Sequence, residues 1–295
     1  MDSFRGANCE YRDRLFKFIF GNPENKEWTL SLYNAVNGSS YTNPDDITLT
    51  TIEDAVYMSM KNDVSFLIAD TMSLYEQQST FNPNMPMRFL VYAGMTYSRY
   101  MNDSPDYHKY SSKQQQAPTP KCVCFYNGKT EKDDTVILKL SDSFKPDSKS
   151  DIEVTVTMLN INYGRNKELM KSCQPLHDYS FFVEEVRMNK KQTNNLEEAI
   201  DSALRELPDD SVIKPFLLAN KAEVKHMCIT EYDEERTLRE LREDSKEEGR
   251  AEGRTEGMLN TLIGLVKDGI LTLTDAASRA DMTVEEFEIR TGLKA

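Results

Sequence analysis

The chain has 295 residues, of which 39% are hydrophobic, and its formal net charge is −13. This composition supports a sizeable core and excludes wholesale disorder, and the length suits one large domain or two smaller ones. The acidic balance also excludes a protein that holds DNA by bulk positive charge, so any contact with DNA must be local.

The sequence carries no signal for export, membrane insertion or zinc binding. No run of about 18 apolar residues occurs, and the N-terminus MDSFRGANCEYRDR lacks the apolar segment of a signal peptide. The five cysteines form no CxxC pair, and the three histidines are far apart in the sequence. We therefore expect a protein of the reducing cytoplasm that does not contact a membrane.

The first part of the chain predicts two helices and then three strands. Apolar residues at helical spacing predict helices at residues 11–20 and 24–36, with Gly21-Asn22-Pro23 between them. Strands are predicted at residues 52–58, 63–68 and 73–80. The short connections between these strands indicate an antiparallel meander.

The next elements alternate between helix and strand. A helix is predicted at residues 86–101, with Asn82 or Asn84 as its cap and Pro86 in its first turn. A polar loop separates this helix from a fourth strand, which ends at Asn127-Gly128. The remaining strands are predicted at residues 136–140 and 152–159, after the fourth strand at residues 121–126, and the chain is mostly helical from Asn166.

One predicted strand contains three consecutive polar residues, Glu76, Gln77 and Gln78. Strands favour β-branched and aromatic residues, so this strand is either exposed or lines a site with one of its faces. Glu76 and Gln78 point to the same face because side chains alternate along a strand. Asp63 joins them if the preceding turn has an even number of residues, since it then lies opposite Glu76 or Gln78. A turn of odd length would separate Asp63 from them.

Two carboxylates and one amide in this arrangement favour a bound cation. Carboxylates held close together repel each other unless a proton or a cation lies between them. Ligand sets made of oxygen atoms favour a hard ion such as Mg²⁺, which can activate water and stabilise charge on a scissile phosphate. The alternative interpretation is that Asp63 and Glu76 are ordinary solvated side chains.

Several segments of the sequence resemble one family. NDVSFLI (residues 62–68), followed by LYEQQSTFNPNMPMR (residues 74–88), is similar to the PD-(D/E)XK nuclease-like family, in its branch of recombination-promoting nucleases and transposases. LFKFIFGNPE, SLYNAVNG and FYNG also resemble that family, in the expected order. The resemblance implies a mixed α/β fold with a restriction-endonuclease-like core of a helix, a three-strand meander, a helix and a strand. We therefore expect a nuclease-like domain at residues 1–230 and a helical C-terminal region at residues 231–295.

The resemblance also implies a metal-dependent DNA endonuclease that hydrolyses phosphodiester bonds with Mg²⁺ or Mn²⁺, linked to recombination or to defence against foreign DNA. Asp63 matches the Asp of the family motif and Glu76 matches its Glu, and both would hold the metal ion. Gln78 stands where many members of the superfamily have Lys, although Gln is usual in this branch. A Gln can orient water or phosphate only by hydrogen bonds, so catalysis would depend more on the metal.

Other positions and another function stay open beside this assignment. Arg88, in the first turn of the following helix, is a candidate contact for a DNA phosphate, with a surface ion pair as the alternative. Glu53 is a further candidate metal ligand, although a structural role is favoured there. The alternative function is that of a catalytically weak nuclease-like protein that binds DNA or protein partners through its C-terminal helices.

The C-terminal region contains the repeat EEGRAEGRTEG, in which Gly249, Gly253 and Gly257 form one stripe on a helix. Each glycine costs about 1 kcal/mol relative to alanine in a helix interior, and the close approach of a second helix could recover that cost. The stripe therefore predicts a homo-oligomer formed through the C-terminal helices, with a solvated acidic linker as the alternative.

Residues 259–289 are predicted to form three short helices, with Thr272 or Thr274 and Thr283 as caps. Short turns between three helices are typical of a helix-turn-helix. Carboxylates on the last helix would repel DNA phosphates, so a packing or dimerisation module is favoured over a DNA reader.

Overall fold

The computed structural model describes residues 14–50, 63–104, 107–108, 110–193 and 195–293. The chain divides into two compact units, Met1–Tyr232 and Asp233–Ala295. The boundary expected at residue 230 lies two residues from this division. One helix, α8 (Lys221–Lys267), continues across the division.

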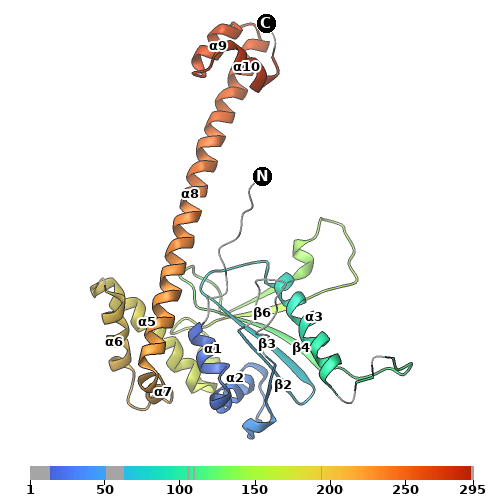
Figure 1. Ribbon diagram of the computed structural model, residues 1–295, viewed down its shortest axis with the longest axis vertical. Helices are drawn as coiled ribbons and strands as arrows, with labels where there is room; N and C mark the ends of the chain where they lie inside the picture. The colour runs from blue at the N-terminus through green and yellow to red at the C-terminus, as the bar shows by residue number, and fades with distance from the viewer. Residues whose placement is uncertain (1–13, 51–62, 105–106, 109, 194, 294–295) are drawn as a thin grey trace. The chain divides into compact units, whose positions relative to one another are not determined.

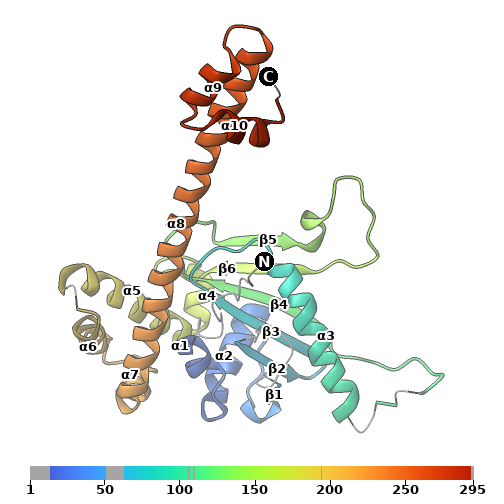
Figure 2. The same ribbon diagram turned by 45° about the horizontal axis from the view of Figure 1, so that its top comes forward.

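A mixed sheet of six strands forms the centre of the first unit, in the order β1-β2-β3-β4-β6-β5 (Figure 2). The strands are β1 (Thr48–Leu49), β2 (Val64–Ile68), β3 (Thr71–Gln78), β4 (Thr119–Tyr126), β5 (Thr135–Lys139) and β6 (Thr155–Asn160). Strands β1 to β3 are antiparallel neighbours, β4 and β6 run parallel to β3, and β5 is antiparallel to β6. The parallel strands are aligned at their ends, where Gln78 pairs with Tyr126 and Tyr126 with Asn160.

Helices cover both faces of this sheet, and a hydrophobic core lies on each side (Figure 1). Helix α3 (Met85–Asp103) covers one face, where Leu74 packs with Phe89. The other face packs against the remaining helices, and Tyr75 belongs to that core. This core receives side chains from α1 (Arg14–Phe20), α2 (Lys26–Asn37), α4 (Lys167–Ser172), α5 (Gln174–Thr193), α6 (Leu196–Glu206), α7 (Lys214–Ala219) and the start of α8. Short 3₁₀ turns occur in the first unit at Pro23–Asn25, Pro44–Asp46 and Leu140–Ser143.

Local signals determine where the helices beside the site begin and end. Helix α2 ends at Gly38, whose backbone is left-handed (φ 63°) and whose N–H donates to the carbonyl oxygen of Asn34. Helix α3 has Pro86 in its first turn, as expected. The expected side-chain cap of α3 is wrong, because Asn84 makes no capping hydrogen bond and Asn82 Oδ1 instead accepts from the Asn84 N–H (2.9 Å). The asparagines therefore shape the turn that leads into α3.

The mixed α/β fold is confirmed, and strands β2 to β6 lie within a few residues of their predicted positions, whereas β1 has no predicted counterpart. The strand predicted at residues 52–58, and Glu53 with it, lie outside the described residues. A restriction-endonuclease-like core stays a prediction. Within the part of the chain that the structure describes, no helix is both long and apolar enough to cross a membrane.

The second unit has a small core of its own, formed around Leu262, Ala276 and Phe287. Helices α9 (Leu273–Arg279) and α10 (Val284–Thr291) follow α8. The prediction of three short helices is wrong for the first of them, because residues 259–267 are the end of α8, which has 47 residues. The predicted caps Thr272 and Thr283 are confirmed, and Thr283 forms a reciprocal capping box with Glu286; Thr274 lies inside α9.

A pair of glycine substitutions tests how closely β3 and β4 approach at their ends. A Cβ on Gly128 would lie 2.3 Å from the carbonyl oxygen of Ser79, so we expect Gly128→Ala to destabilise the fold by about 1–3 kcal/mol. A Cβ on Gly94, in α3, would meet nothing within 4 Å, so Gly94→Ala should stabilise by up to about 1 kcal/mol. Urea unfolding midpoints measure both, and equal effects would contradict the packing at Gly128.

Candidate metal centre

The β2–β3 hairpin determines which residues share a face of the sheet. Ile68 pairs with Thr71, which leaves Ala69 and Asp70 as the turn, so the turn has the even length that the metal-site interpretation requires. The last pair is Val64 with Tyr75, and one residue further along each chain Asp63 follows opposite Glu76. The carboxylate of Asp63 is held there, because its Oδ2 accepts a hydrogen bond from the backbone N–H of Gln77 (2.7 Å).

The polar segment of β3 is buried. Glu76 is 1% exposed, Gln77 0% and Gln78 8%, so the alternative of an exposed strand with a solvated Glu76 is wrong. Alternation along the strand places Glu76 and Gln78 on one face, as predicted, and Gln77 on the other. The face with Glu76 is the one that α3 covers.

Two side chains of α3, one turn apart, surround the Glu76 carboxylate. Arg88 forms an ion pair with Glu76 Oε1, and the Tyr92 hydroxyl lies 3.5 Å from the same oxygen. Arg88 also donates to the Tyr92 hydroxyl from Nη2 (2.7 Å) and Nε (3.2 Å). The ion pair of Arg88 is therefore not on the surface, since its partner is buried.

The second oxygen of this carboxylate is incompletely satisfied. Glu76 Oε2 is buried and has no hydrogen-bond partner among the residues that the structure describes. Burial raises the pKa of Glu76 to about 7, although Arg88 and Tyr92 lower it. A buried acceptor without a donor costs about 1–3 kcal/mol, and more when the group is charged. Glu76 is therefore a group that a further cation would stabilise.

Asp63 contributes charge to the same place. Burial raises the pKa of Tyr92 most. The charge of Glu76 raises it further, Arg88 lowers it, and the charge of Asp63 makes a smaller contribution that raises it. Burial lowers the pKa of Arg88, whereas its pairing with Glu76 raises it. The charge of Asp63 raises the pKa of Arg88 as well. Both carboxylates therefore act on the same Arg–Tyr pair.

The Gln78 amide completes this side of the site. In one orientation its Nε2 faces Met85 Sδ (2.7 Å), which is a weak acceptor. After a 180° turn, its oxygen accepts from Arg88 Nη1 (3.3 Å) and its nitrogen donates to the carbonyl oxygen of Thr80 (3.3 Å). We prefer the second orientation because it satisfies both ends of the amide. Gln78 thus lies beside Arg88 as well as Glu76.

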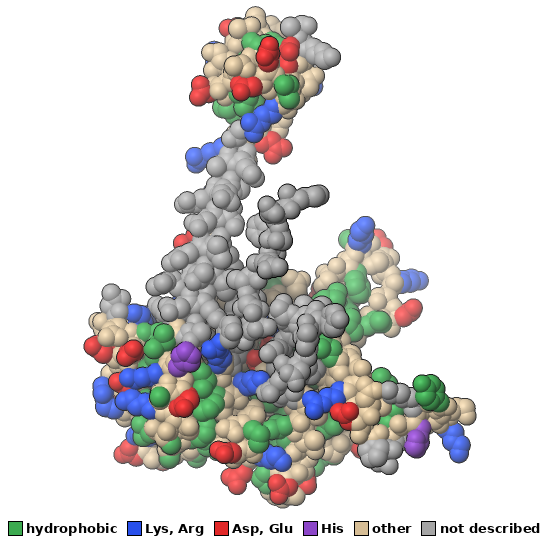
Figure 3. Space-filling view, in the orientation of Figure 1, with side chains coloured by type: hydrophobic (Ala, Val, Ile, Leu, Met, Phe, Trp, Pro, Cys, Tyr) green, Lys and Arg blue, Asp and Glu red, His purple; other side chains and the backbone are tan. Residues whose placement is uncertain are grey.

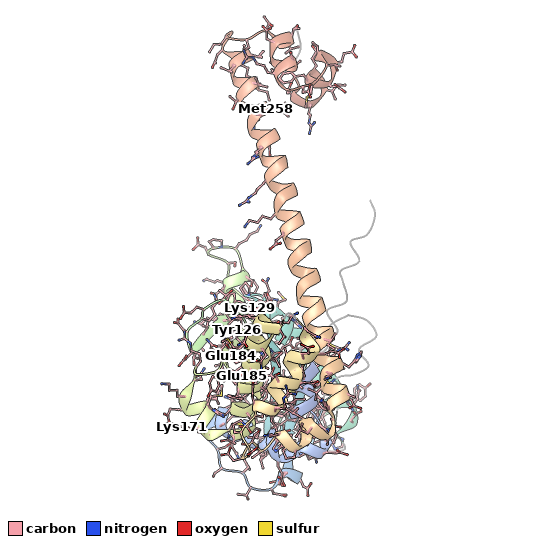
Figure 4. The ribbon with its side chains drawn as sticks, turned by 90° about the vertical axis from the view of Figure 1, so that its left-hand side faces the viewer. Tyr126, Lys129, Lys171, Glu184, Glu185 and Met258 are labelled. Atoms are coloured by element: carbon pink, nitrogen blue, oxygen red, sulfur yellow. The ribbon has the colours of Figure 1, made fainter. Side chains whose placement is uncertain are left out.

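The opposite face of β3 carries a network of amide and hydroxyl groups that one arginine joins. Gln77 Nε2 donates to Asn127 Oδ1 (2.6 Å), and Asn127 Nδ2 donates to the Tyr179 hydroxyl (3.3 Å). Arg187 of α5 donates to the carbonyl oxygen of Asn127. Figure 4 labels Tyr126, the last residue of β4, which belongs to the core on the α3 side, and Lys129 in the loop that follows it. The network links the ends of β3 and β4 to α5 and brings no carboxylate to the Glu76 side of the sheet.

Sequence reasoning did not identify Tyr92 or Asn127. Tyr92 follows Arg88 by one helical turn, and the buried residues of α3 on either side of it, Phe89 and Thr96, have the spacing of a core-facing stripe. An Arg and a Tyr one turn apart, on a helix that faces a strand with a Glu, are the signal that could have pointed to Tyr92. Asn127 has no comparable signal, because it reads as a turn residue.

The donor set fits a hard divalent ion with few protein ligands. Within the described ranges no group of three or more His, Cys, Asp and Glu side chains could hold a metal ion. Asp63 and Glu76 provide two carboxylates, and Mg²⁺ is commonly bound by one or two carboxylates with water and substrate phosphate. The unpartnered Oε2 of Glu76 is an oxygen that such an ion would satisfy.

Charges of both signs are mixed on the surrounding surface. Arg165 pairs with Glu131 (2.5 Å), and Lys132 lies over the ring of Phe81 (3.8 Å to the centroid). Figure 3 shows Lys and Arg side chains interspersed with Asp and Glu over the described surface in view. Contacts with a polyanion on this surface would therefore be local.

No family model matches the chain, and no curated protein or solved structure is significantly similar to it.

Two arginines of α3 form ion pairs that differ in burial, and they test the energetics of the site. Arg88→Met should destabilise the fold by about 3 kcal/mol, because it leaves the buried Glu76 without its cation. Arg99→Met removes an exposed pair with Asp103 and should change stability by less than about 0.5 kcal/mol. Urea unfolding compares them, and similar losses for both variants would contradict the burial of the Glu76–Arg88 pair.

Proposed function

We propose that this protein is a metal-dependent DNA endonuclease, a phosphodiester hydrolase that uses Mg²⁺ or Mn²⁺. The observation that carries the proposal is the buried Glu76 carboxylate, which has one unpartnered oxygen and lies across the hairpin from Asp63. A mixed sheet with a helix on the Glu76 side supports a restriction-endonuclease-like core. The resemblance of the surrounding sequence to the recombination-promoting nuclease branch supports a role in recombination or in defence against foreign DNA.

Each residue of the site has a distinct part in this proposal. Asp63 and Glu76 would hold the ion, and Asp63 is oriented for this by the Gln77 N–H. When bound, the ion supplies an activated water and offsets charge on the scissile phosphate. Gln78 would orient the water or a phosphate oxygen through its amide, and Arg88 would bind a phosphate oxygen with its guanidinium.

One observation favours a second candidate, a nuclease-like protein that binds partners without efficient cleavage. Arg88 already neutralises Glu76 in part, and Gln78 brings no positive charge to the site. A protein of this kind would act on DNA or on protein partners through its C-terminal helices. Cleavage assays separate the two candidates.

We also propose that copies of this chain associate through α8 and the helices after it. A Cβ added to Gly253 or Gly257 would meet nothing within 4 Å in the described chain. No packing among the described residues therefore requires these glycines, although each weakens the helix by about 1 kcal/mol. Close approach of the same helix from a second copy would give them a role.

Plasmid cleavage tests the proposed chemistry. We expect the wild type to nick or linearise supercoiled plasmid with Mg²⁺ and to lose this activity in EDTA. Asp63→Asn and Glu76→Gln should abolish cleavage, because they remove the anchors of the ion. Gln78→Ala should slow single-turnover cleavage by about 10²–10³, because it removes only a positioning group, and Gln78→Lys should keep or raise the rate.

The outcomes of the cleavage assay point in different directions. Wild-type cleavage by Asp63→Asn would place the activity elsewhere. Absence of cleavage by every variant, the wild type included, would favour the binding protein.

Truncation tests self-association. We expect the full chain to sediment as two or more copies per particle, and a chain ending at Tyr232 to sediment as a single copy. The truncated chain keeps Val224, which is buried in the core of the first unit, so its fold should survive. The same number of copies per particle before and after truncation would exclude α8 as the interface.

A further inference from the structure

We propose that Arg88 is a built-in counter-ion that occupies Glu76 in the metal-free protein and releases it to a divalent cation, turning its guanidinium toward a phosphate group of the substrate. The inference rests on the proposed function and adds a form of regulation at the same site. Its basis is the contacts of four described residues: Glu76, Gln78, Arg88 and Tyr92.

Arg88 and a metal ion compete for the same carboxylate. The guanidinium pairs with Glu76 Oε1, and the other oxygen, Oε2, is buried without a described partner. A divalent ion bound to Glu76 would therefore lie beside a positive charge inside a region of low dielectric, where repulsion is strong. Binding of the ion and retention of the Arg88 pair oppose each other.

Arg88 keeps other partners when it leaves Glu76. Its Nε and Nη2 both donate to the Tyr92 hydroxyl, and Nη1 lies 3.3 Å from the oxygen of Gln78 in the preferred orientation of that amide. The side chain is 26% exposed, whereas the Glu76 side chain is 2% exposed. Tyr92 and Gln78 can therefore hold part of the guanidinium after it has left Glu76.

A guanidinium released in this way suits a phosphate group. Its planar array of donors binds two oxygens of a phosphate in parallel, and its charge persists at every physiological pH. The metal ion and the phosphate would then each help the other to bind, because the ion frees Arg88 and the phosphate keeps it away from Glu76. Without metal, the pair keeps Glu76 neutralised and the site closed to reaction.

Metal binding measured by calorimetry tests this exchange without reference to activity. We expect Arg88→Gln to bind Mn²⁺ about tenfold more tightly than the wild type, because the competing cation is gone. Arg99→Gln is the matched control, since Arg99 lies on the same helix with an exposed partner, and should bind as the wild type does. Glu76→Gln should lose the binding.

The possible failures are distinguishable. If Glu76→Gln binds Mn²⁺ as the wild type does, or if no variant binds it, the proposed metal site is overturned. If binding depends on Glu76 but a folded Arg88→Gln binds Mn²⁺ no more tightly than the wild type, the proposed function stands and the exchange is overturned.

A measurement on the wild type covers the case in which Arg88→Gln fails to fold. The Nε–H signal of Arg88 in an NMR spectrum, assigned with Arg88→Lys, should shift when Mg²⁺ saturates the protein, because the guanidinium changes its partner. The corresponding signal of Arg99 should stay in place. An Arg88 signal that is unchanged at saturating Mg²⁺ would overturn the exchange.

Discussion

The length of the β2–β3 turn determines which side chains of the first unit face α3 and which face the opposite core. Side chains alternate along a strand, so one residue more or less between β2 and β3 would exchange the faces of a whole strand relative to its partner. With Ala69 and Asp70 in the turn, Glu76 and Asp63 come together on the side of α3. Arg88 and Tyr92 of α3 contact the Glu76 carboxylate, so the polar residues of this helix are explained by the residues of β3 that they face.

The two faces of β3 accommodate polar groups in different ways. On one face, Gln77 lies in a network of amide and hydroxyl groups with Asn127, and its one unpartnered oxygen carries no net charge. On the other face, Glu76 brings a charge into the core, and a single arginine satisfies only one of its oxygens. A buried carboxylate oxygen without a partner costs more than a buried amide oxygen without one, so an ion would stabilise the second face more than the first.

Local signals are sufficient to predict many of the elements, because each depends on a few neighbouring residues. The stop at Gly38, the start of α3 near Pro86 and the capping box at Thr283 are of this kind. The alternation in β3 likewise predicts that Glu76 and Gln78 share a face. The order of the outer strands and the inward pairing of Arg88 depend on residues far apart in sequence, and an arginine in the first turn of a helix suits solvent equally well. Helix α8 continues through its glycines because the Glu, Arg and Ala residues around them favour helix enough to offset the helix stability that each glycine loses.

An open sheet has unpaired hydrogen-bonding groups along its outer strands, and these are the usual route to uncontrolled aggregation. In this chain the outer strand β5 has five residues and exposes Thr135, Ile137 and Lys139, while β1 at the other margin has two residues in the described part. A lysine on an outer strand discourages another chain from adding a strand there. The β5 margin of the folded first unit therefore carries its own protection against uncontrolled strand pairing with another chain.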